Sequence, residues 1–137
     1  MTTVYPNQTV ALRIDLPGDF DSWLAVIRRQ LYRVTQEALT NSVKHANAQQ
    51  IIVKLNHNSQ LIELRIADDG EGFDPAEVDM DQHLGLQSMA ERIEALQGTF
   101  EVNSAFGEGT LIIATLPFYR ENFSAPAESN QKLLHVQ

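Results

Sequence analysis

The chain has 137 residues, 43% of them hydrophobic, and a formal net charge of −8. Length and composition are those of one folded domain, and the negative charge argues against a non-specific surface for nucleic acid or anionic membranes, which requires a positive field. The absence of cysteine excludes disulfides, zinc–thiolate sites and thiol nucleophiles. No apolar run approaches the roughly 20 residues that span a bilayer, and the N-terminus lacks the layout of a signal peptide. We therefore expect a cytoplasmic chain that binds no nucleic acid and makes no direct membrane contact.

The first part of the chain predicts one strand followed by one long helix. Residues 10–14 alternate apolar and polar side chains, as a half-buried strand does. From residue 22 to residue 46 the apolar residues recur at helical spacing. We expect Asp21 or Ser22 to cap the start of this helix and Asn47 to follow its end in the left-handed conformation.

The next part predicts a hairpin and then a loop. Two strands are expected at 50–56 and 61–67, joined by a turn at 57–60. The following segment is rich in Asp, Glu, Gly and Pro and continues to about residue 84, which predicts a long loop of functional importance.

The last part predicts a second helix and a second hairpin. Helical spacing resumes at Leu86 and is expected to end at a Gly98 cap. Strands are expected at 99–104 and 110–116. The order of elements predicts an α+β fold with helices layered on one face of a mixed sheet. We assign residues 1–117 to this domain and residues 118–137 to a polar tail that we expect to be poorly ordered.

One face of the first predicted helix carries four polar residues. Glu37, Asn41, Lys44 and His45 fall at i, i+4, i+7 and i+8, so they share a face, which is either simply solvated or functional. In the functional interpretation Asn41 offers a neutral oxygen to Mg²⁺, Glu37 orients or deprotonates a nucleophile, and Lys44 neutralises phosphate. His45 near a helix end also suits a packing role or a dipole partner.

Three glycine-bearing segments follow. Asp69, Gly70 and Gly72 come after a strand and form either a plain turn or an adenine site, where a carboxylate accepts a hydrogen bond from the exocyclic amine and glycine lets backbone approach the ring. Gly85 and Leu86, expected at a helix start, are either a hinge or an anion site made by free N–H groups.

The third segment contains Gly107, Gly109 and Thr110. Its simplest interpretation is a hairpin turn. In the functional alternative, the Thr110 hydroxyl is presented to a base edge or a bound water. Neither a P-loop nor a dinucleotide-binding Gly-x-Gly-x-x-Gly motif is present, so a nucleotide would be bound by another architecture.

The four features in this order resemble the GHKL ATPase family, which includes histidine kinases, DNA gyrase and heat-shock chaperone ATPases and has the Bergerat fold. Residues 37–46 resemble the N box of that family, and residues 69–73, 85–89 and 107–110 resemble its three glycine boxes. The resemblance covers about residues 8 to 118.

Within the family, residues 41–46 and 83–98 resemble sensor histidine kinases of the nitrate-sensor and desaturase-thermosensor type. These have a short ATP lid, here about 74–84, and no separate phenylalanine box. The chain departs from the pattern at Gln97-Gly98, where two glycines are common. We expect this difference to be structural and minor.

The resemblance implies a two-layer α/β sandwich that binds ATP and Mg²⁺ and acts as the catalytic domain of a histidine kinase. Its implied roles are adenine binding by Asp69, pocket shaping by Gly72, Mg²⁺ coordination by Asn41, phosphate binding by Lys44, Gly85 and Leu86, and orientation of the attacking group by Glu37.

The implied partners are a histidine-bearing dimerisation domain of the parent kinase, outside this chain, and a response regulator downstream. On this interpretation the domain is cytoplasmic or the cytoplasmic part of a membrane-bound sensor. One alternative is a stand-alone regulator of the same fold, such as an anti-sigma factor with serine kinase activity. Another is a degenerate module that binds nucleotide without catalysis.

Overall fold

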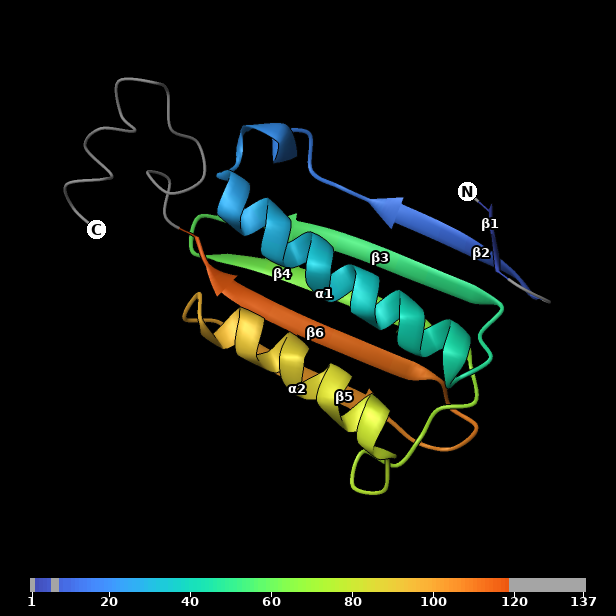
Figure 1. Ribbon diagram of the computed structural model, residues 1–137. Coiled ribbons are helices and arrows are strands. Elements are labelled where there is room, and N and C mark those ends of the chain that lie inside the picture. The colour runs from blue at the N-terminus through green and yellow to red at the C-terminus, as the bar shows by residue number, and fades with distance from the viewer. Residues whose placement is uncertain (1, 6–7, 119–137) are drawn as a thin grey trace.

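The computed structural model describes residues 2–5 and 8–118, with side chains described from Val10 onward. They form one six-stranded sheet in the order β1-β2-β3-β4-β6-β5, and two helices cover one face of it (Figure 1). The strands are β1 (Thr2–Tyr5), β2 (Gln8–Asp15), β3 (Gln50–His57), β4 (Leu61–Asp68), β5 (Thr99–Ser104) and β6 (Thr110–Pro117). The helices are α1 (Ala25–Lys44) and α2 (Met80–Glu94), with a short 3₁₀ turn, η1 (Phe20–Ser22), ahead of α1.

The sheet is mixed because α1 carries the chain back to the end of the sheet at which β2 starts, so that β3 runs in the same direction as β2. β2 and β3 therefore pair in parallel, whereas the other neighbouring strands that the structure describes pair antiparallel. The predicted α+β class with helices on one face of a mixed sheet is confirmed, and β1 is an additional edge strand. The predicted tail covers residues 118–137, of which 119–137 lie outside the described residues. Its first residue, Phe118, packs against the core and donates its backbone N–H to the carbonyl of Gln60 at 2.8 Å.

The core lies between the helices and the sheet. In β4, every second residue (Ile62, Leu64, Ile66) is buried against the helices, at 0–2% exposure. The buried stripes of the helices meet this face with the following residues: Ile27, Leu31, Val34 and Ala38 of α1 and Met89 and Ile93 of α2. The period of two in the strands and of 3.6 in the helices thus directs the apolar side chains to one shared layer.

The start of α1 differs from the expectation. Neither Asp21 nor Ser22 caps it, since both belong to η1, and the N-cap position is taken by Leu24 without a side-chain hydrogen bond. Trp23, only 2% exposed, stands between the two elements with extended backbone (ψ 155°). Burial of this large ring separates the turn from the helix, so the prediction that one continuous helix begins at residue 22 was wrong.

The start of α2 also differs, by six residues. The helix begins at Met80 because Asp79 caps it, its side chain accepting a hydrogen bond from the backbone N–H of Gln82 at 2.8 Å. The expected start at Leu86 was wrong because a polar residue, Gln82, occupies the first buried position of the stripe and hides the apolar period. The loop between β4 and α2 is correspondingly shorter than predicted and ends at Asp79.

The end of α2 explains the departure at Gln97-Gly98. The left-handed residue is Gln97, with φ 64°, and not Gly98 as expected. Gly98 instead donates its backbone N–H to the carbonyl of Ile93 at 3.0 Å, and a Cβ there would overlap the carbonyl oxygen of Thr115. Position 97 is therefore the one at which glycine would relieve the cost of a positive φ. At position 98 glycine is required because the backbone of Thr115 in β6 approaches closely.

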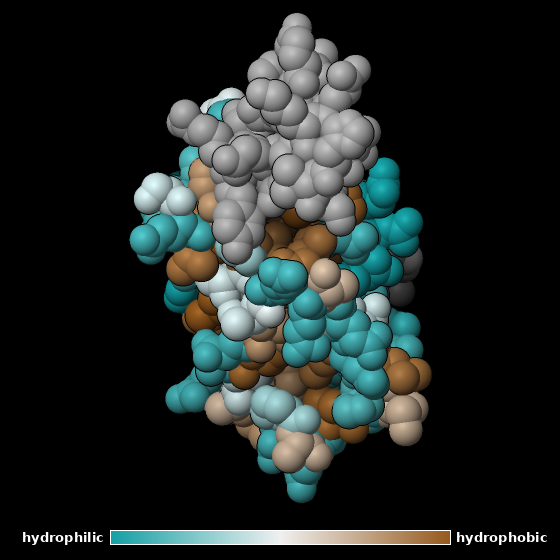
Figure 2. All heavy atoms as spheres, turned by 90° about the vertical axis from the view of Figure 1, so that its left-hand side faces the viewer, coloured by the Kyte–Doolittle hydropathy of each residue, from teal (hydrophilic) through white to brown (hydrophobic). Residues whose placement is uncertain are grey.

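On the side of the molecule shown in Figure 2, hydrophobic atoms outside the grey region lie interleaved with hydrophilic ones. Exposed large hydrophobic residues are spread over several elements: Ile14, Leu16, Val26, Tyr32, Leu61, Met80, Leu84 and Phe106. Singly scattered residues of this kind are normal on protein surfaces. Among the described residues, neither helix is long and apolar enough to cross a bilayer.

Candidate active site

The C-terminal half of α1, the end of β4 and the start of β6 surround one small cavity. Its volume is about 10 Å³, which is room for about one water molecule. Its polar lining comes from Asn41 and Ser42 of α1, Asp68 of β4 and Thr110 of β6, and Leu86 of α2 closes it. All four predicted segments thus contribute to this cavity, because Phe73 of the first glycine segment also lines it.

Asn41 is the central polar residue of the predicted helix face. It is only 9% exposed, and its side-chain nitrogen has no hydrogen-bond partner among the described residues. A buried amide without a partner is unfavourable by about 1–3 kcal/mol. Its position beside the cavity therefore suits a residue whose partner is a bound ligand.

The two adjacent aspartates at the end of β4 have different surroundings. Asp68, half-buried, lines the cavity, where its carboxylate accepts hydrogen bonds from the hydroxyl of Ser42 (2.7 Å) and the backbone N–H of Gly70 (2.9 Å). Asp69 is exposed, and one of its oxygens accepts the backbone N–H groups of Gln49 and Gln50, each at 2.9 Å. Asp69 fastens the chain before β3 to the end of β4 and lies outside the cavity.

The sequence contained a signal that selects Asp68 over Asp69. Ile62, Leu64 and Ile66 face the helices, and Asp68 is the next residue of the same parity. Because successive side chains of a strand alternate between faces, a strand extended by one residue would have placed Asp68 on the helix side. Ser42, which holds that carboxylate, was also missed, since a serine in a helix carries no distinctive pattern.

The first and third glycine segments pack directly on each other. The backbone N–H of Gly107 donates to the carbonyl of Glu71 at 2.6 Å. At Gly72 (φ 70°) a Cβ would overlap the carbonyl oxygen of Ala105, and at Gly109 (φ 71°) it would overlap that of Asp68. Both positions therefore require glycine, and the close approach fixes the end of β4 against the start of β6.

Gly70 and Gly107 have simpler roles. A Cβ at Gly70 would crowd the backbone and side chain of Ala46, and the neighbouring backbone N–H of Glu71 donates to the carbonyl of Ala46 at 2.7 Å. Gly107 (φ 83°) has open space around it and serves the turn.

Gly85 brings the second glycine segment against the predicted helix face. It is buried inside α2, and a Cβ there would overlap the carboxylate oxygen of Glu37. The expected anion site at a helix start is not present at Gly85 and Leu86, because backbone N–H groups inside an α-helix are used by its own hydrogen-bond ladder.

Lys44 and His45 lie at the end of α1 beside the start of α2. Both approach the same oxygen of Asp81, the Lys44 Nζ at 3.4 Å and the His45 Nε2 at 3.3 Å. The lysine and aspartate side chains are 61% and 67% exposed, so this pair contributes little to stability. The contact places two cation-forming side chains at the α2 end of the site.

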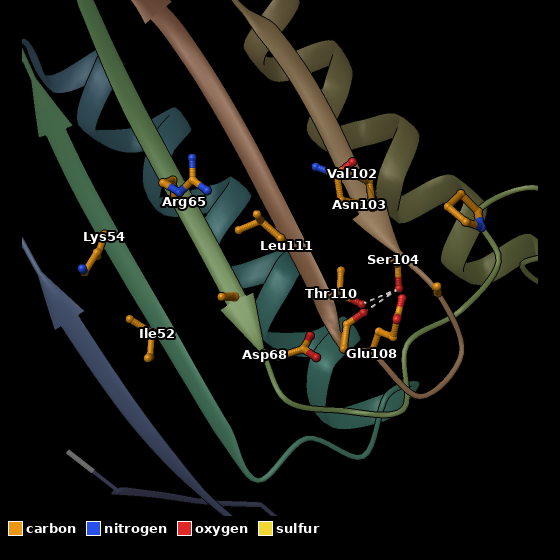
Figure 3. A pocket seen from close by; sticks show the side chains of 14 residues that line it. Ile52, Lys54, Arg65, Asp68, Val102, Asn103, Ser104, Glu108, Thr110 and Leu111 are labelled. Atoms are coloured by element: carbon orange, nitrogen blue, oxygen red, sulfur yellow. Dashed lines mark hydrogen bonds between the residues drawn. The ribbon is translucent and has the colours of Figure 1, made fainter.

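A larger groove of about 790 Å³ opens on the other face of the sheet. Figure 3 shows Ile52, Lys54, Arg65 and Leu111 along it, with the helices behind the strands. Neither Asn41 nor Leu86 lines this groove. Asp68 and Thr110 line both spaces. The smaller cavity is the better candidate despite its size, because it alone of the two also contains Asn41 and Leu86.

Thr110 belongs to the boundary between the two spaces. It is 8% exposed, and its hydroxyl lies 2.8 Å from that of Ser104, as Figure 3 shows. The Ser104 hydroxyl also accepts the backbone N–H of Phe73 at 2.9 Å, so the pair joins the loop after β4 to the β5–β6 hairpin.

Comparison with known proteins identifies relatives of this chain. A family model described as histidine kinase-, DNA gyrase B-, and HSP90-like ATPase matches residues 27–120. The chain is 37% identical over 89 residues to the signal transduction histidine-protein kinase/phosphatase DegS of Bacillus subtilis, covering 64% of this chain and 23% of DegS. It is 36% identical over 96 residues to the sensor protein VraS of Staphylococcus haemolyticus, covering 70% of this chain and 27% of VraS.

Two solved structures share the fold. The histidine kinase domain of the Erythrobacter litoralis blue-light activated kinase EL346 matches with a TM-score of 0.56 at 17% identity, over 81% of this chain and 52% of that one. The Acinetobacter baumannii histidine kinase AdeS matches with a TM-score of 0.59 at 20% identity, over 79% and 54%. The family match extends over more than half of the sequence, so the predicted resemblance is confirmed, and the chain belongs to the histidine kinase-, DNA gyrase B-, and HSP90-like ATPases.

Proposed function

We propose that the chain is the ATP-binding catalytic domain of a sensor histidine kinase, which supplies the γ-phosphoryl group to a histidine on a separate dimerisation domain. The observation that carries the proposal is the convergence of Asn41, Asp68 and Thr110 on one cavity. Phosphoryl transfer depends mainly on positioning and charge neutralisation, so such a site requires no nucleophile of its own.

At the adenine end, Asp68 replaces Asp69 as the residue we assign to the exocyclic amine. Its carboxylate is held in the cavity by Ser42 and Gly70, and a carboxylate is an acceptor for an N–H donor. Gly72 lets the carbonyl of Ala105 approach closely, and so helps to shape the backbone beside the proposed adenine pocket. Thr110 contributes a buried hydroxyl to the same lining.

At the phosphate end, Asn41 and Lys44 are the residues we assign to Mg²⁺ and phosphate. No cluster of three or more His, Asp or Glu side chains that could hold a metal occurs in the part of the chain that the structure describes. This donor set fits Mg²⁺ held by one amide oxygen together with phosphate oxygens and water, since Mg²⁺ keeps several waters and needs few protein ligands. Bound there, the ion would neutralise charge on the phosphates.

Glu37 is the residue we assign to orienting the attacking group. Its carboxylate lies against Gly85 in α2, so its position depends on the packing between the two helices. The cavity of about 10 Å³ is far smaller than a nucleotide site. Nucleotide therefore enters when the loop before α2 and the start of α2 move away from α1.

The partners and the location belong to the same proposal. The chain spans about a quarter of the length of DegS and VraS, whose printed names are those of a signal transduction kinase and a sensor protein. By analogy we assign this chain a histidine-bearing dimerisation domain as its phosphate acceptor, a response regulator downstream, and a position in the cytoplasm.

The test is phosphoryl transfer from the complete 137-residue chain to a separately prepared dimerisation domain. With γ-labelled ATP and Mg²⁺ we expect an acid-labile, base-stable label on that domain, as a phosphohistidine gives. The matched control is Glu37→Gln, which should bind ATP and transfer slowly. Absence of ATP binding in calorimetry would contradict the proposal, and a base-labile phosphoserine on a supplied sigma-factor regulator would favour the serine kinase alternative.

A further inference from the structure

Gln82 is a buried polar side chain to which the proposed site gives no role. It is 6% exposed, and its side-chain nitrogen, Nε2, has no hydrogen-bond partner among the described residues. Glutamine is mostly exposed in folded proteins, and a buried donor without an acceptor destabilises the state that contains it. Such a group calls for a partner that the protein alone does not supply.

The packing of the two helices brings the α2 turn that carries Gln82 towards the C-terminal part of α1, which carries Asn41. Gly85 of α2 lies against Glu37 of α1, and Asp81 lies against Lys44. The helices therefore run antiparallel here, and the α2 turn that carries Gln82 faces the α1 turn that carries Asn41.

Both facing amides have an unpartnered nitrogen. The Nδ2 of Asn41 and the Nε2 of Gln82 are buried N–H donors on opposite walls of the same helix pair. A pair of donors selects a ligand that only accepts hydrogen bonds, as phosphate oxygens do. Lys44 reaches Asp81, next to Gln82 in the chain, so a lysine ammonium group that could neutralise phosphate lies near Gln82.

We propose that Gln82 is a phosphate-binding residue of this domain, donating its side-chain N–H to a phosphate oxygen of the bound nucleotide next to Asn41. The inference rests on the proposed ATP binding and extends it to a residue of α2. Binding then gives the buried amide the acceptor that it lacks in the nucleotide-free protein. Gln82 thus adds affinity for the phosphates and links the start of α2 to their presence.

The test compares Gln82→Leu with the wild type and with Gln36→Leu, all in the 137-residue chain. Gln36 is an exposed helical glutamine outside the four predicted segments, so it controls for the change of residue type. For Gln82→Leu we expect a higher melting temperature without nucleotide, because the buried unpartnered donor is gone. We also expect about tenfold weaker binding of ATP and ADP in calorimetry (about 1.4 kcal/mol), with adenosine binding unchanged by NMR titration. Gln36→Leu should bind all three ligands as the wild type does.

The outcomes are separable. If Gln82→Leu binds ATP as tightly as the wild type, Gln82 has no phosphate contact, although the proposed function stands. An equal loss for adenosine assigns Gln82 a structural role and also overturns the inference. If Gln82→Leu fails to fold, Gln82→Glu keeps the size of the side chain and opposes the phosphates by its charge, so ATP affinity should fall more than adenosine affinity. A wild-type chain that binds no ATP overturns both proposals.

Discussion

Replacing each aspartate at the end of β4 by asparagine, one at a time, tests the adenine site most directly. Asp68→Asn and Asp69→Asn remove the same charge from adjacent positions, so any general effect of charge on an ATP-binding domain is equal in the two variants. Only the surroundings differ, because Asp68 lines the cavity and Asp69 is exposed.

The expected magnitudes follow from the hydrogen bonds. A hydrogen bond to a charged group is worth about 1.5–3 kcal/mol, so Asp68→Asn should weaken ATP binding by about 10- to 150-fold. Asp69→Asn keeps the oxygen that accepts the Gln49 and Gln50 N–H groups, so its affinity should stay within about twofold of wild type. Both variants should unfold within about 1 kcal/mol of the wild type.

Isothermal titration with ATP and Mg²⁺ measures the affinities, and chemical denaturation measures the stabilities. Loss of binding in Asp69→Asn with normal binding in Asp68→Asn would refute the assignment of Asp68. Equal losses in both variants would mean that charge alone acts at this end of the sheet.

Three further changes test other parts of the fold and site. Gly85→Ala should keep or raise the melting temperature, since alanine favours helix over glycine by about 1 kcal/mol. The same change should slow phosphoryl transfer by about 100-fold, because the new Cβ displaces the Glu37 carboxylate. Normal transfer rates would argue against a positioning role for the contact between Gly85 and Glu37. Gln97→Gly should stabilise the domain by about 1 kcal/mol in denaturant titration, because the left-handed backbone there suits glycine, and a destabilised variant would contradict this reading of the helix end. Asn41→Ala should weaken ATP binding more with Mg²⁺ than with EDTA in calorimetry, whereas equal losses would exclude Asn41 as a metal ligand.

Much of the fold followed from periodicity. Five of the six strands and both helices were predicted, because their apolar residues repeat at two or 3.6 residues and face one core, whereas β1 was not predicted. The predicted starts of α1 and α2 were wrong because in each case one side chain determines where the helix begins. Trp23 separates η1 from α1, and Gln82 occupies a core position of α2 that a pattern of apolar residues cannot reveal.

The site was predicted as four segments but not in atomic detail. The segments do meet, and Asn41 and Gly72 lie at their junction. The choice between Asp68 and Asp69 depends on whether β4 ends at residue 67, as predicted, or at residue 68, as observed. The contact of Gly85 with Glu37 depends on the packing of two helices. The first follows from the alternation of β4 once its length is known, whereas only tertiary packing sets the second.

The position of β6 between β4 and β5 has a consequence for the order of folding. Asp68 and Thr110 are register partners across β4 and β6, although 42 positions separate them in the sequence. During synthesis β4 is an unpaired edge until β6 emerges, and unpaired edges are prone to pair with other chains. The cavity therefore forms only when β6 is inserted, and ATP stabilises only chains that have completed this step. A chain truncated after Ser104 should show no ATP-dependent rise in melting temperature, and such a rise would mean that the site forms without the last strand.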